Sequence, residues 1–284
     1  MKVTGSTLVM GIFGNPVHHS LSPGMHNAAA EALGMHVVYV PFLIEKGRLG
    51  QAVEGIRALG LLGVNVTVPF KEAVCAYLDR MDPLAAQIGS VNTIVCQNHQ
   101  LVGYNTDAPG FLMAIQKDLG ISLFGKRVCC LGAGGTARAI GFALMGQGLA
   151  GFSILNRTVE KAWAIRDHLA DAGDVAIEVE GLNTVRAFSL LAEADLVINT
   201  TSVGLSEATQ MPLSTMTWVT PRQTVYDCIY RPAVTPFLAA AQERGARVSN
   251  GLGMLVAQGA LAFTLLTGQE APFDVMKRTV EDLC

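Results

Sequence analysis

Lys71 stands directly after an apolar segment in which polar residues alternate with valines. In the segment NVTVPFK, alternation places Asn65 and Thr67 on one face of a strand, and Pro69 is predicted to begin a helix over residues 71–78. A cation in the first turn of a helix opposes the helix dipole, so a lysine placed there indicates a function. An amine suits proton transfer to and from a hydroxyl group. The alternative is a lysine that bends out to solvent.

Further polar residues lie at the ends of two other predicted strands. Asn92 stands directly before one of them, and Asn105 and Asp107 follow the next. In open α/β sheets, ligand sites lie outside the carboxyl ends of the strands. We therefore expect Asp107 to pair with Lys71 and orient it. The alternative is that Asn105 or Asp107 only caps the following helix.

Two serines precede the first predicted helix. Ser22 is a good N-cap and Pro23 suits the first helical position, so capping explains Ser22 but does not explain Ser20. Two hydroxyl groups at a helix N-terminus can also bind a small carboxylate. Capping alone and carboxylate binding both remain open on this segment.

A glycine-rich turn joins a predicted buried strand, residues 127–131, to a predicted helix. The first glycine of such a turn allows the tight bend, the second lets a phosphate approach, and Ala137 takes the third small position. Backbone N–H groups at the helix start can bind a pyrophosphate. The alternative is a tight turn without a ligand. The candidate dinucleotide residues are Gly132, Ala133, Gly134, Gly135 and Thr136.

The next predicted strand ends in residues that favour NADP over NAD. An NAD site carries an Asp or Glu there for the ribose hydroxyls, whereas this chain has Asn156, Arg157 and Thr158, followed by Lys161. Two cations attract a 2′-phosphate, and a guanidinium can grip it with two hydrogen bonds. The alternative is that both cations are solvated surface charges, and Glu160 weakens the case for NADP slightly.

The elements that must position these residues alternate along the chain. Apolar strand-like runs and helical patterns follow one another in a β-α-β-α series, which predicts an α/β fold with parallel sheets. The 284 residues suggest two domains. We place the boundary in or around residues 110–119, before the glycine-rich turn.

Composition excludes several classes of protein. Only 15% of residues are charged, half are apolar, and mean hydropathy is +0.38, the reverse of a disordered chain. A formal charge of −3 argues against a nucleic-acid binder. The longest apolar stretch, 252–266, is shorter than the about 20 residues of a membrane span. Low charge is instead typical of parallel sheets covered on both faces.

The six cysteines predict a reducing compartment. None forms a C-x-x-C pair, and adjacent Cys129 and Cys130 would point to opposite faces of a strand. Buried free thiols in the cytoplasm are the better interpretation. The apolar run 8–13 leads into a turn rather than a cleavage site, so it indicates a first strand and not a signal peptide. No metal site is expected.

Taken together, these segments resemble the shikimate dehydrogenase family. The match follows the family's order along nearly the whole chain. The matching segments are HSLSP at 19–23, MHN at 25–27, NVTVPFK at 65–71, VNT at 91–93, GYNTD at 103–107, GAGGTARA at 132–139, NRTVEK at 156–161, NTTSVG at 199–204, DCIYRP at 227–232 and GLGMLVAQ at 251–258.

The resemblance implies a reversible, NADPH-dependent reduction of 3-dehydroshikimate to shikimate, in aromatic amino acid (chorismate) biosynthesis. It implies two α/β domains with a cleft between them. One is a substrate-binding domain, residues 1–109 completed by about 250–284, and the other is a Rossmann-type NADP-binding domain, residues 110–249. The expected partner is a small-molecule substrate, with neither nucleic acid nor membrane, and a homodimer is one option for the assembly.

The resemblance also implies roles for individual residues. Lys71 would transfer the proton, with Asp107 as its partner. Ser20 and Ser22 would hold the substrate carboxylate, with Tyr230 nearby. Ring hydroxyls would be held by Asn65, Thr67, Asn92, Asp107 and Gln258. The dinucleotide would be held by residues 132–136 and 156–161, with Cys228 and Gly251 beside the nicotinamide mainly through their backbone.

The chain departs from the family at three positions. Phe70 stands where the family often has His, Asn250 where Asp is common, and Gly259 where Ala is usual. Two alternative functions remain. One is a quinate/shikimate dehydrogenase that uses NAD or NADP, since such relatives share most of the motifs. The other is a non-catalytic protein that binds the cofactor as a sensor, against which the intact Lys71, Asp107 and Gln258 argue.

Overall fold

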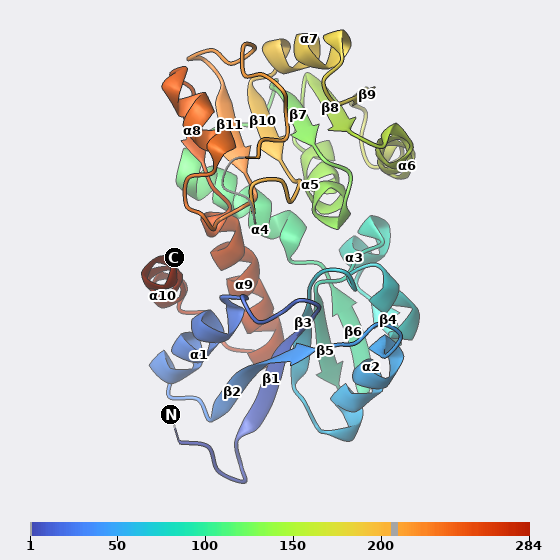
Figure 1. Cartoon of the computed structure of the whole chain (residues 1–284). Helices are drawn as coiled ribbons and strands as arrows, with labels where there is room; N and C mark the ends of the chain where they lie inside the picture. The colour runs from blue at the N-terminus through green and yellow to red at the C-terminus, as the bar shows by residue number, and fades with distance from the viewer. Residues whose placement is uncertain (1, 206–209) are drawn as a thin grey trace. The chain divides into compact units, whose positions relative to one another are not determined.

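The computed structural model describes residues 2–205 and 210–284. The chain divides into two compact units (Figure 1). The first unit comprises Met1–Gly110 and Val256–Leu283, and the second comprises Phe111–Leu255 with Cys284. Each unit contains a sheet and its covering helices, so the α/β class is confirmed.

The described part of the first unit contains a six-stranded sheet in the order β2-β1-β3-β5-β6-β4. Strands β1, β2 and β3 are parallel, whereas β5 runs antiparallel to both β3 and β6. The strands are β1 Leu8–Gly14, β2 Val37–Leu43, β3 Gly63–Val66, β4 Arg80–Met81, β5 Thr93–Gln97 and β6 Gln100–Tyr104.

The expectation of parallel pairing is therefore wrong for the two pairings that β5 makes, whereas β4 and β6 pair in parallel. Strands β5 and β6 form a hairpin whose two central residues, Asn98 and His99, both have positive φ (51° and 64°). This is the backbone of a tight turn whose twist matches that of the flanking strands. Short β4 and helix α3 were also not predicted, because elements of two and six residues carry too little periodicity.

Helices from both ends of the chain build the first unit. They are α1 Ser22–Ala32, α2 Leu49–Ala58, the 3₁₀ helix η1 Ala73–Tyr77, α3 Pro83–Ile88 and α10 Phe273–Leu283, together with the start of α4 (Asp107–Ala114) and most of α9 (Leu252–Thr267). Helix α10 lies beside α1 (Figure 1). One core cluster joins the sheet to α2 and η1 through Val53, Val64, Phe70 and Val74.

The described part of the second unit contains a fully parallel six-stranded sheet in the order β12-β11-β10-β7-β8-β9. Numbered from β7, this is the doubly wound order 3-2-1-4-5-6 of a Rossmann fold, with the reversal of direction between β7 and β10. The strands are β7 Arg127–Leu131, β8 Gly151–Asn156, β9 Ile177–Gly181, β10 Leu196–Asn199, β11 Thr224–Asp227 and β12 Arg247–Ser249. The helices are α5 Gly135–Met145, α6 Val159–Leu169, α7 Val185–Glu193 and α8 Pro236–Glu243, and a π-helical turn, η2 Ile115–Leu119, continues α4.

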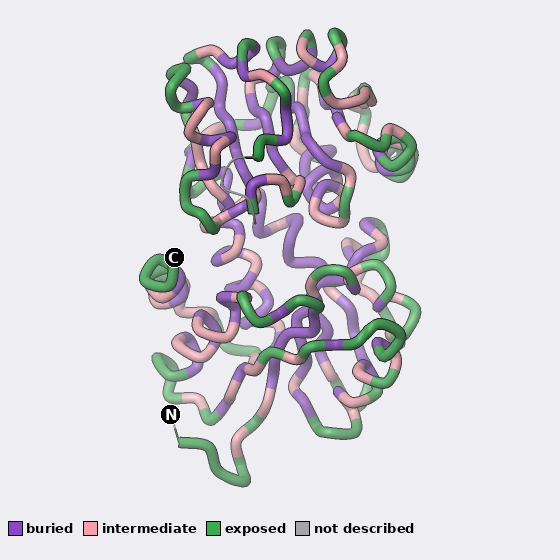
Figure 2. Tube along the Cα trace, in the orientation of Figure 1, coloured by how far each residue is buried: buried purple, intermediate pink, exposed green. Residues whose placement is uncertain are grey.

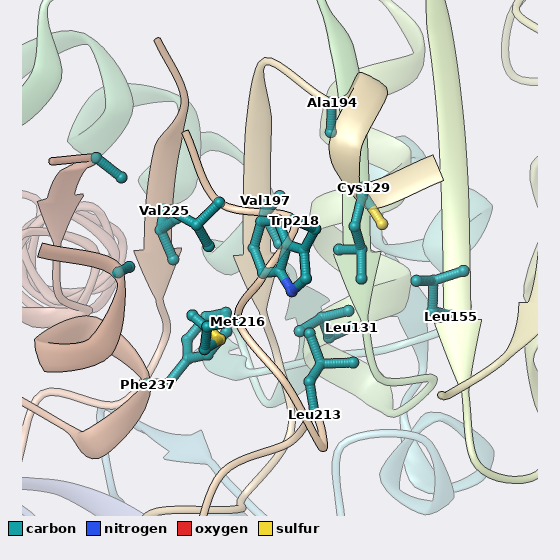
Figure 3. Close-up of a cluster of buried hydrophobic side chains, with 14 of the residues drawn as sticks. Cys129, Leu131, Leu155, Ala194, Val197, Leu213, Met216, Trp218, Val225 and Phe237 are labelled. Atoms are coloured by element: carbon teal, nitrogen blue, oxygen red, sulfur yellow. The ribbon is translucent and has the colours of Figure 1, made fainter. Parts of the chain in front are cut away.

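The central strands of the second unit are buried on both faces (Figure 2). Trp218, Met216 and Leu213, from the loop before β11, pack over the sheet residues Leu131 and Val197 (Figure 3). Strands covered in this way read as continuous apolar runs, which accounts for the scarcity of charge in the sequence. Among the described residues, no helix is both long and apolar enough to cross a membrane.

Candidate active site

Lys71 and Asp107 form an ion pair in the first unit. Lys71 Nζ donates to Asp107 Oδ2 at 2.7 Å, and the two side chains are 18% and 7% exposed. A lysine ammonium has three N–H donors. Lys71 uses one of them for Asp107, so the others can hydrogen-bond to a ligand.

The predicted helix around Lys71 is wrong. Strand β3 ends at Val66, and the following helix is the short 3₁₀ helix η1, which begins at Ala73. Lys71 therefore lies in the turn before the helix, and its carbonyl oxygen accepts from Val91 N at 2.8 Å. Contacts with distant segments hold this lysine, and the helix-dipole argument does not apply.

Asn105 caps helix α4, a role for which the sequence left both Asn105 and Asp107 as candidates. Its Oδ1 accepts from the backbone N–H groups of Asp107 and Ala108 at 3.1 and 3.2 Å. Because Asn105 satisfies these donors, the Asp107 carboxylate is available in the first turn of α4 for Lys71. An acidic residue in that turn is also stabilised by the helix dipole.

Asn92 connects this pair to α9. Its Nδ2 donates to Asp107 Oδ1 and to Thr106 Oγ1, both at 2.9 Å, and lies 3.4 Å from Gln258 Oε1. Its Oδ1 accepts from Thr106 N at 2.8 Å. Four predicted site residues thus belong to one hydrogen-bonded group: Lys71, Asn92, Asp107 and Gln258. Thr106 was missed, although it stands between two residues that were predicted.

Asn65 and Thr67 lie along and just beyond β3. The Asn65 Nδ2 donates to Asn92 O at 3.1 Å and to Thr93 Oγ1 at 3.0 Å, so its amide is held within the protein. Thr67 is half-buried, and its backbone accepts from Phe70 N and donates to Phe13 O. Among the described residues its hydroxyl has no partner, so it can serve a ligand.

The prediction that Ser22 caps α1 is wrong. The N-cap residue is Leu21, without a side-chain cap, and Ser22 is the first helical residue. Ser20 Oγ instead accepts from Ser22 N at 3.3 Å. Ser22 is buried. The capping explanation for Ser22 is thereby removed.

In the second unit, the glycine-rich turn follows β7 at the point where the strand order reverses. Gly132 has a φ of +109°, and an added Cβ would lie 2.5 Å from Thr200 Oγ1. Gly134 is exposed at the start of α5, and an added Cβ would meet nothing within 4 Å. Ala137 is buried against the sheet. Ala133, Gly135 and Thr136 are partly exposed, so an open approach leads to the N-terminus of α5.

The residues after β8 fit a phosphorylated ribose. Arg157 and Lys161 are exposed, and within residues 2–205 and 210–284 neither is in an ion pair. Asn156 Nδ2 donates to Thr158 O at 2.8 Å, which shapes the turn that carries Arg157. Together with the open turn after β7, these two cations suit an NADP molecule.

A buried carboxylate shapes the loop after β11. Asp227 is fully buried, and it accepts from Asn199 Nδ2 (3.0 Å), Ile229 N (3.0 Å) and Thr235 Oγ1 (2.7 Å). Burial raises its pKa, and the three donors oppose that shift. The sequence assigned Asp227 no role of its own.

Of the predicted nicotinamide residues, Cys228 lies on this loop and Gly251 follows β12. Gly251 approaches the loop so closely that an added Cβ would lie 2.1 Å from Cys228 O, so only glycine fits. Cys228 N donates to Asn199 O at 2.9 Å. Tyr230 is partly buried, and burial raises the pKa of its phenol.

Three family models match consecutive parts of the chain. Residues 12–94 match the shikimate dehydrogenase substrate binding domain, 114–216 match shikimate / quinate 5-dehydrogenase, and 251–281 match the shikimate 5′-dehydrogenase C-terminal domain. A curated relative from Moorella thermoacetica, a shikimate dehydrogenase (NADP(+)), is 48% identical over 99% of this chain and 95% of its own length. The chain belongs to the shikimate dehydrogenase family.

Solved structures of the family superimpose on the whole chain. A shikimate dehydrogenase in complex with NADP+ is 37% identical with a TM-score of 0.92, covering 99% of this chain and 97% of its own. The shikimate 5-dehydrogenase from Thermus thermophilus, in complex with NADP(H) and shikimate, is also 37% identical, with a TM-score of 0.87 and coverage of 98% and 100%.

The three departures from the family pattern have structural explanations. Phe70 is buried in the core cluster of the first unit, where a side chain without polar atoms needs no partner. Asn250 donates through Nδ2 to Ala233 O at 2.9 Å, which an Asp carboxylate could not do. At Gly259 an added Cβ would lie 2.2 Å from the Met25 Cε, so Met25 occupies the space of the usual alanine.

Proposed function

We propose that this chain catalyses the reversible, NADPH-dependent reduction of 3-dehydroshikimate to shikimate. The ion pair of Lys71 and Asp107, 2.7 Å apart and held by Asn92, carries the proposal. A cofactor-sensing protein needs no lysine held in this way. Membership of the shikimate dehydrogenase family supports the same reaction.

Lys71 is the proton-transfer residue in this proposal. Oxidation of a ring alcohol removes a hydride from carbon and a proton from the hydroxyl oxygen. The neutral Lys71 amine accepts that proton, and in the reductive direction its ammonium returns the proton to the carbonyl oxygen. Asp107 orients the amine and stabilises the ammonium form. NADP, when bound, supplies the hydride chemistry.

The other residues of the first unit bind the substrate in this proposal. Ser20 and Ser22 hold its carboxylate, and Tyr230 is a further candidate for binding the substrate. Amide, hydroxyl and carboxylate side chains match a polyhydroxylated ring, which both donates and accepts hydrogen bonds. The ring hydroxyls are bound by Asn65, Thr67, Asn92, Asp107 and Gln258.

Four steady-state assays test the proposal. The kcat/KM is measured for shikimate and for quinate, each with NADP and with NAD. We expect the highest value for shikimate with NADP. A higher value for quinate or with NAD would establish the quinate/shikimate alternative. Dinucleotide binding without turnover of either acid would establish the sensor.

Removing both cations after β8 is expected to reduce the preference for NADP. Without Arg157 and Lys161 the 2′-phosphate loses its charge-assisted hydrogen bonds, each worth about 1.5–3 kcal/mol. We expect the double variant Arg157→Gln/Lys161→Gln to raise the KM for NADP about 10-fold or more and to leave the KM for NAD within about 2-fold. Arg166→Gln is the matched control, because this α6 cation already pairs with Asp167. An equal loss with both dinucleotides would contradict the assignment.

Two glycines of the turn after β7 are expected to respond differently to alanine. Gly132→Ala forces a side chain into a positive-φ site against Thr200, so we expect a lower Tm together with weaker NADP binding. Gly134→Ala meets open space, so we expect an unchanged Tm but a Kd for NADP about 10-fold higher, because the methyl group obstructs the phosphate. Thermal unfolding and titration calorimetry measure the two effects. Unchanged NADP binding by Gly134→Ala would place the pyrophosphate elsewhere.

The proposal includes a cellular location. Free thiols at Cys129 and Cys130, both fully buried, support a reducing cytoplasmic location.

The proposal also includes an assembly. Strand β2 forms an edge of the first sheet, and Leu43 on it is 60% exposed, which supports a homodimer that covers this edge. Sedimentation equilibrium measures the assembly, and Leu43→Lys is expected to shift a dimer toward monomer. A monomer at all concentrations would exclude it.

A further inference from the structure

Tyr39 is a buried tyrosine whose hydroxyl contacts Asn65, one of the predicted substrate residues. It lies on β2 with 1% of its surface exposed. Its hydroxyl donates to Asn65 Oδ1 at 2.8 Å. The Asn65 Nδ2 donates to Asn92 O and Thr93 Oγ1, so hydrogen bonds at both the nitrogen and the oxygen fix the orientation of the Asn65 amide.

Burial raises the pKa of Tyr39 well above its ordinary value, so the phenol keeps its proton and remains a donor to Asn65 Oδ1.

Two adjacent residues of α1 hold Tyr39 in place. The Asn27 side chain makes two hydrogen bonds to the backbone of Tyr39: Asn27 Nδ2 donates to Tyr39 O at 2.9 Å, and Tyr39 N donates to Asn27 Oδ1 at 2.8 Å. The His26 ring stacks on the Tyr39 ring with centroids 4.3 Å apart and planes 8° apart. Neither ring nitrogen of His26 has a hydrogen-bond partner among the described residues, so packing is what this histidine contributes.

We propose that Tyr39 is a positioning residue for the substrate site: its hydroxyl holds Asn65 in its binding orientation without touching the substrate. Its burial keeps the phenol from the ligand, and His26 and Asn27 fix the ring and the backbone that carry it. The inference rests on the proposed function, since it takes Asn65 as a substrate-binding residue.

Tyr39→Phe tests the inference, because it keeps the ring and its stacking but deletes the hydroxyl. Asn65 Oδ1 then loses its donor and the amide can reorient. We expect the KM and the calorimetric Kd for shikimate to rise about 10-fold, while kcat changes less than about 3-fold and the Kd for NADP does not change. Tyr226→Phe is the control, because Tyr226 is an equally buried tyrosine in the second unit, and it should leave the Kd for shikimate within about 2-fold.

Calorimetry separates positioning from a loss of folded protein. A misfolded fraction lowers the binding stoichiometry, whereas a displaced Asn65 raises the Kd of the folded fraction. An unchanged Kd for shikimate in folded Tyr39→Phe would overturn the inference, even if the Tm falls.

Combining Tyr39→Phe with Asn65→Ala shows whether the phenol acts through Asn65. If it does, the losses overlap, and the double variant binds shikimate more tightly than the product of the two single losses predicts. Losses that multiply independently would overturn the coupling to Asn65. If Ser22→Ala and Asn65→Ala both bind shikimate normally, the proposed substrate site itself is wrong, a result distinct from failure of Tyr39 alone.

Discussion

Replacing Lys71 with alanine is expected to lower kcat for shikimate oxidation by about 100-fold or more, the scale of a lost general acid–base residue. The Kd for NADP should remain nearly unchanged, because the predicted dinucleotide residues lie in the second unit. The loss of kcat is expected because, among the described residues, Lys71 is the only amine in the hydrogen-bonded group that also contains Asp107, Asn92 and Gln258. Steady-state kinetics and dinucleotide titration measure the two quantities.

Two control variants sharpen this prediction. Lys71→Arg keeps the positive charge but cannot give up its proton at neutral pH, so we expect it not to restore kcat. Lys126→Ala removes a lysine from an exposed ion pair with Asp195, whose side chains are 45% and 40% exposed, and should change kcat less than about 2-fold. Normal turnover by Lys71→Ala would remove this residue from the mechanism.

His26 is expected to make the protein sensitive to acid. Burial lowers its pKa from 6.5 to about 3, so the folded protein keeps the ring neutral. Below about pH 6.5 the unfolded chain binds a proton that the folded chain cannot. The free energy of unfolding should therefore fall by about 1.4 kcal/mol per pH unit until the pH approaches 3. Above pH 6.5 this contribution does not change.

His26→Phe tests this expectation, because it keeps an aromatic ring against Tyr39 and Phe263 but does not titrate. Between pH 6.5 and 4.5 the wild type should lose about 2–3 kcal/mol more than this variant in urea unfolding. His168→Phe is the matched control, since His168 is exposed on α6 and its loss should leave the pH dependence as in the wild type. Parallel pH profiles for wild type and His26→Phe would show that the buried ring is not the acid-sensitive group.

Local patterns predicted much of the second unit. Its strands are buried on both faces, so each reads as a short apolar run between turns, and the glycine-rich turn after β7 lies where the sequence placed it. The first unit was harder to predict. The turn of Asn98 and His99 lacks the glycine that usually marks a tight hairpin, so the two strands were predicted but their antiparallel pairing was not. Asp107 and Lys71 were expected to pair, but the Ser22 cap and the helix at Lys71 were wrong, because local rules do not include the distant groups that hold those residues.

The chemistry of this protein follows from the residue types and their order, because strand, turn and helix signals depend on neighbours within a few positions. The arrangement of the candidate site depends on contacts between residues far apart in the sequence. Asn92 meets Gln258 across 166 positions, and Tyr39 meets Asn65 across 26. Such contacts form only when sheet and helices pack, and packing selects partners by shape and burial rather than by spacing. For this reason the sequence indicated a proton-transfer lysine and a dinucleotide turn, whereas only the folded chain revealed the tyrosine that holds Asn65, a proposed substrate residue.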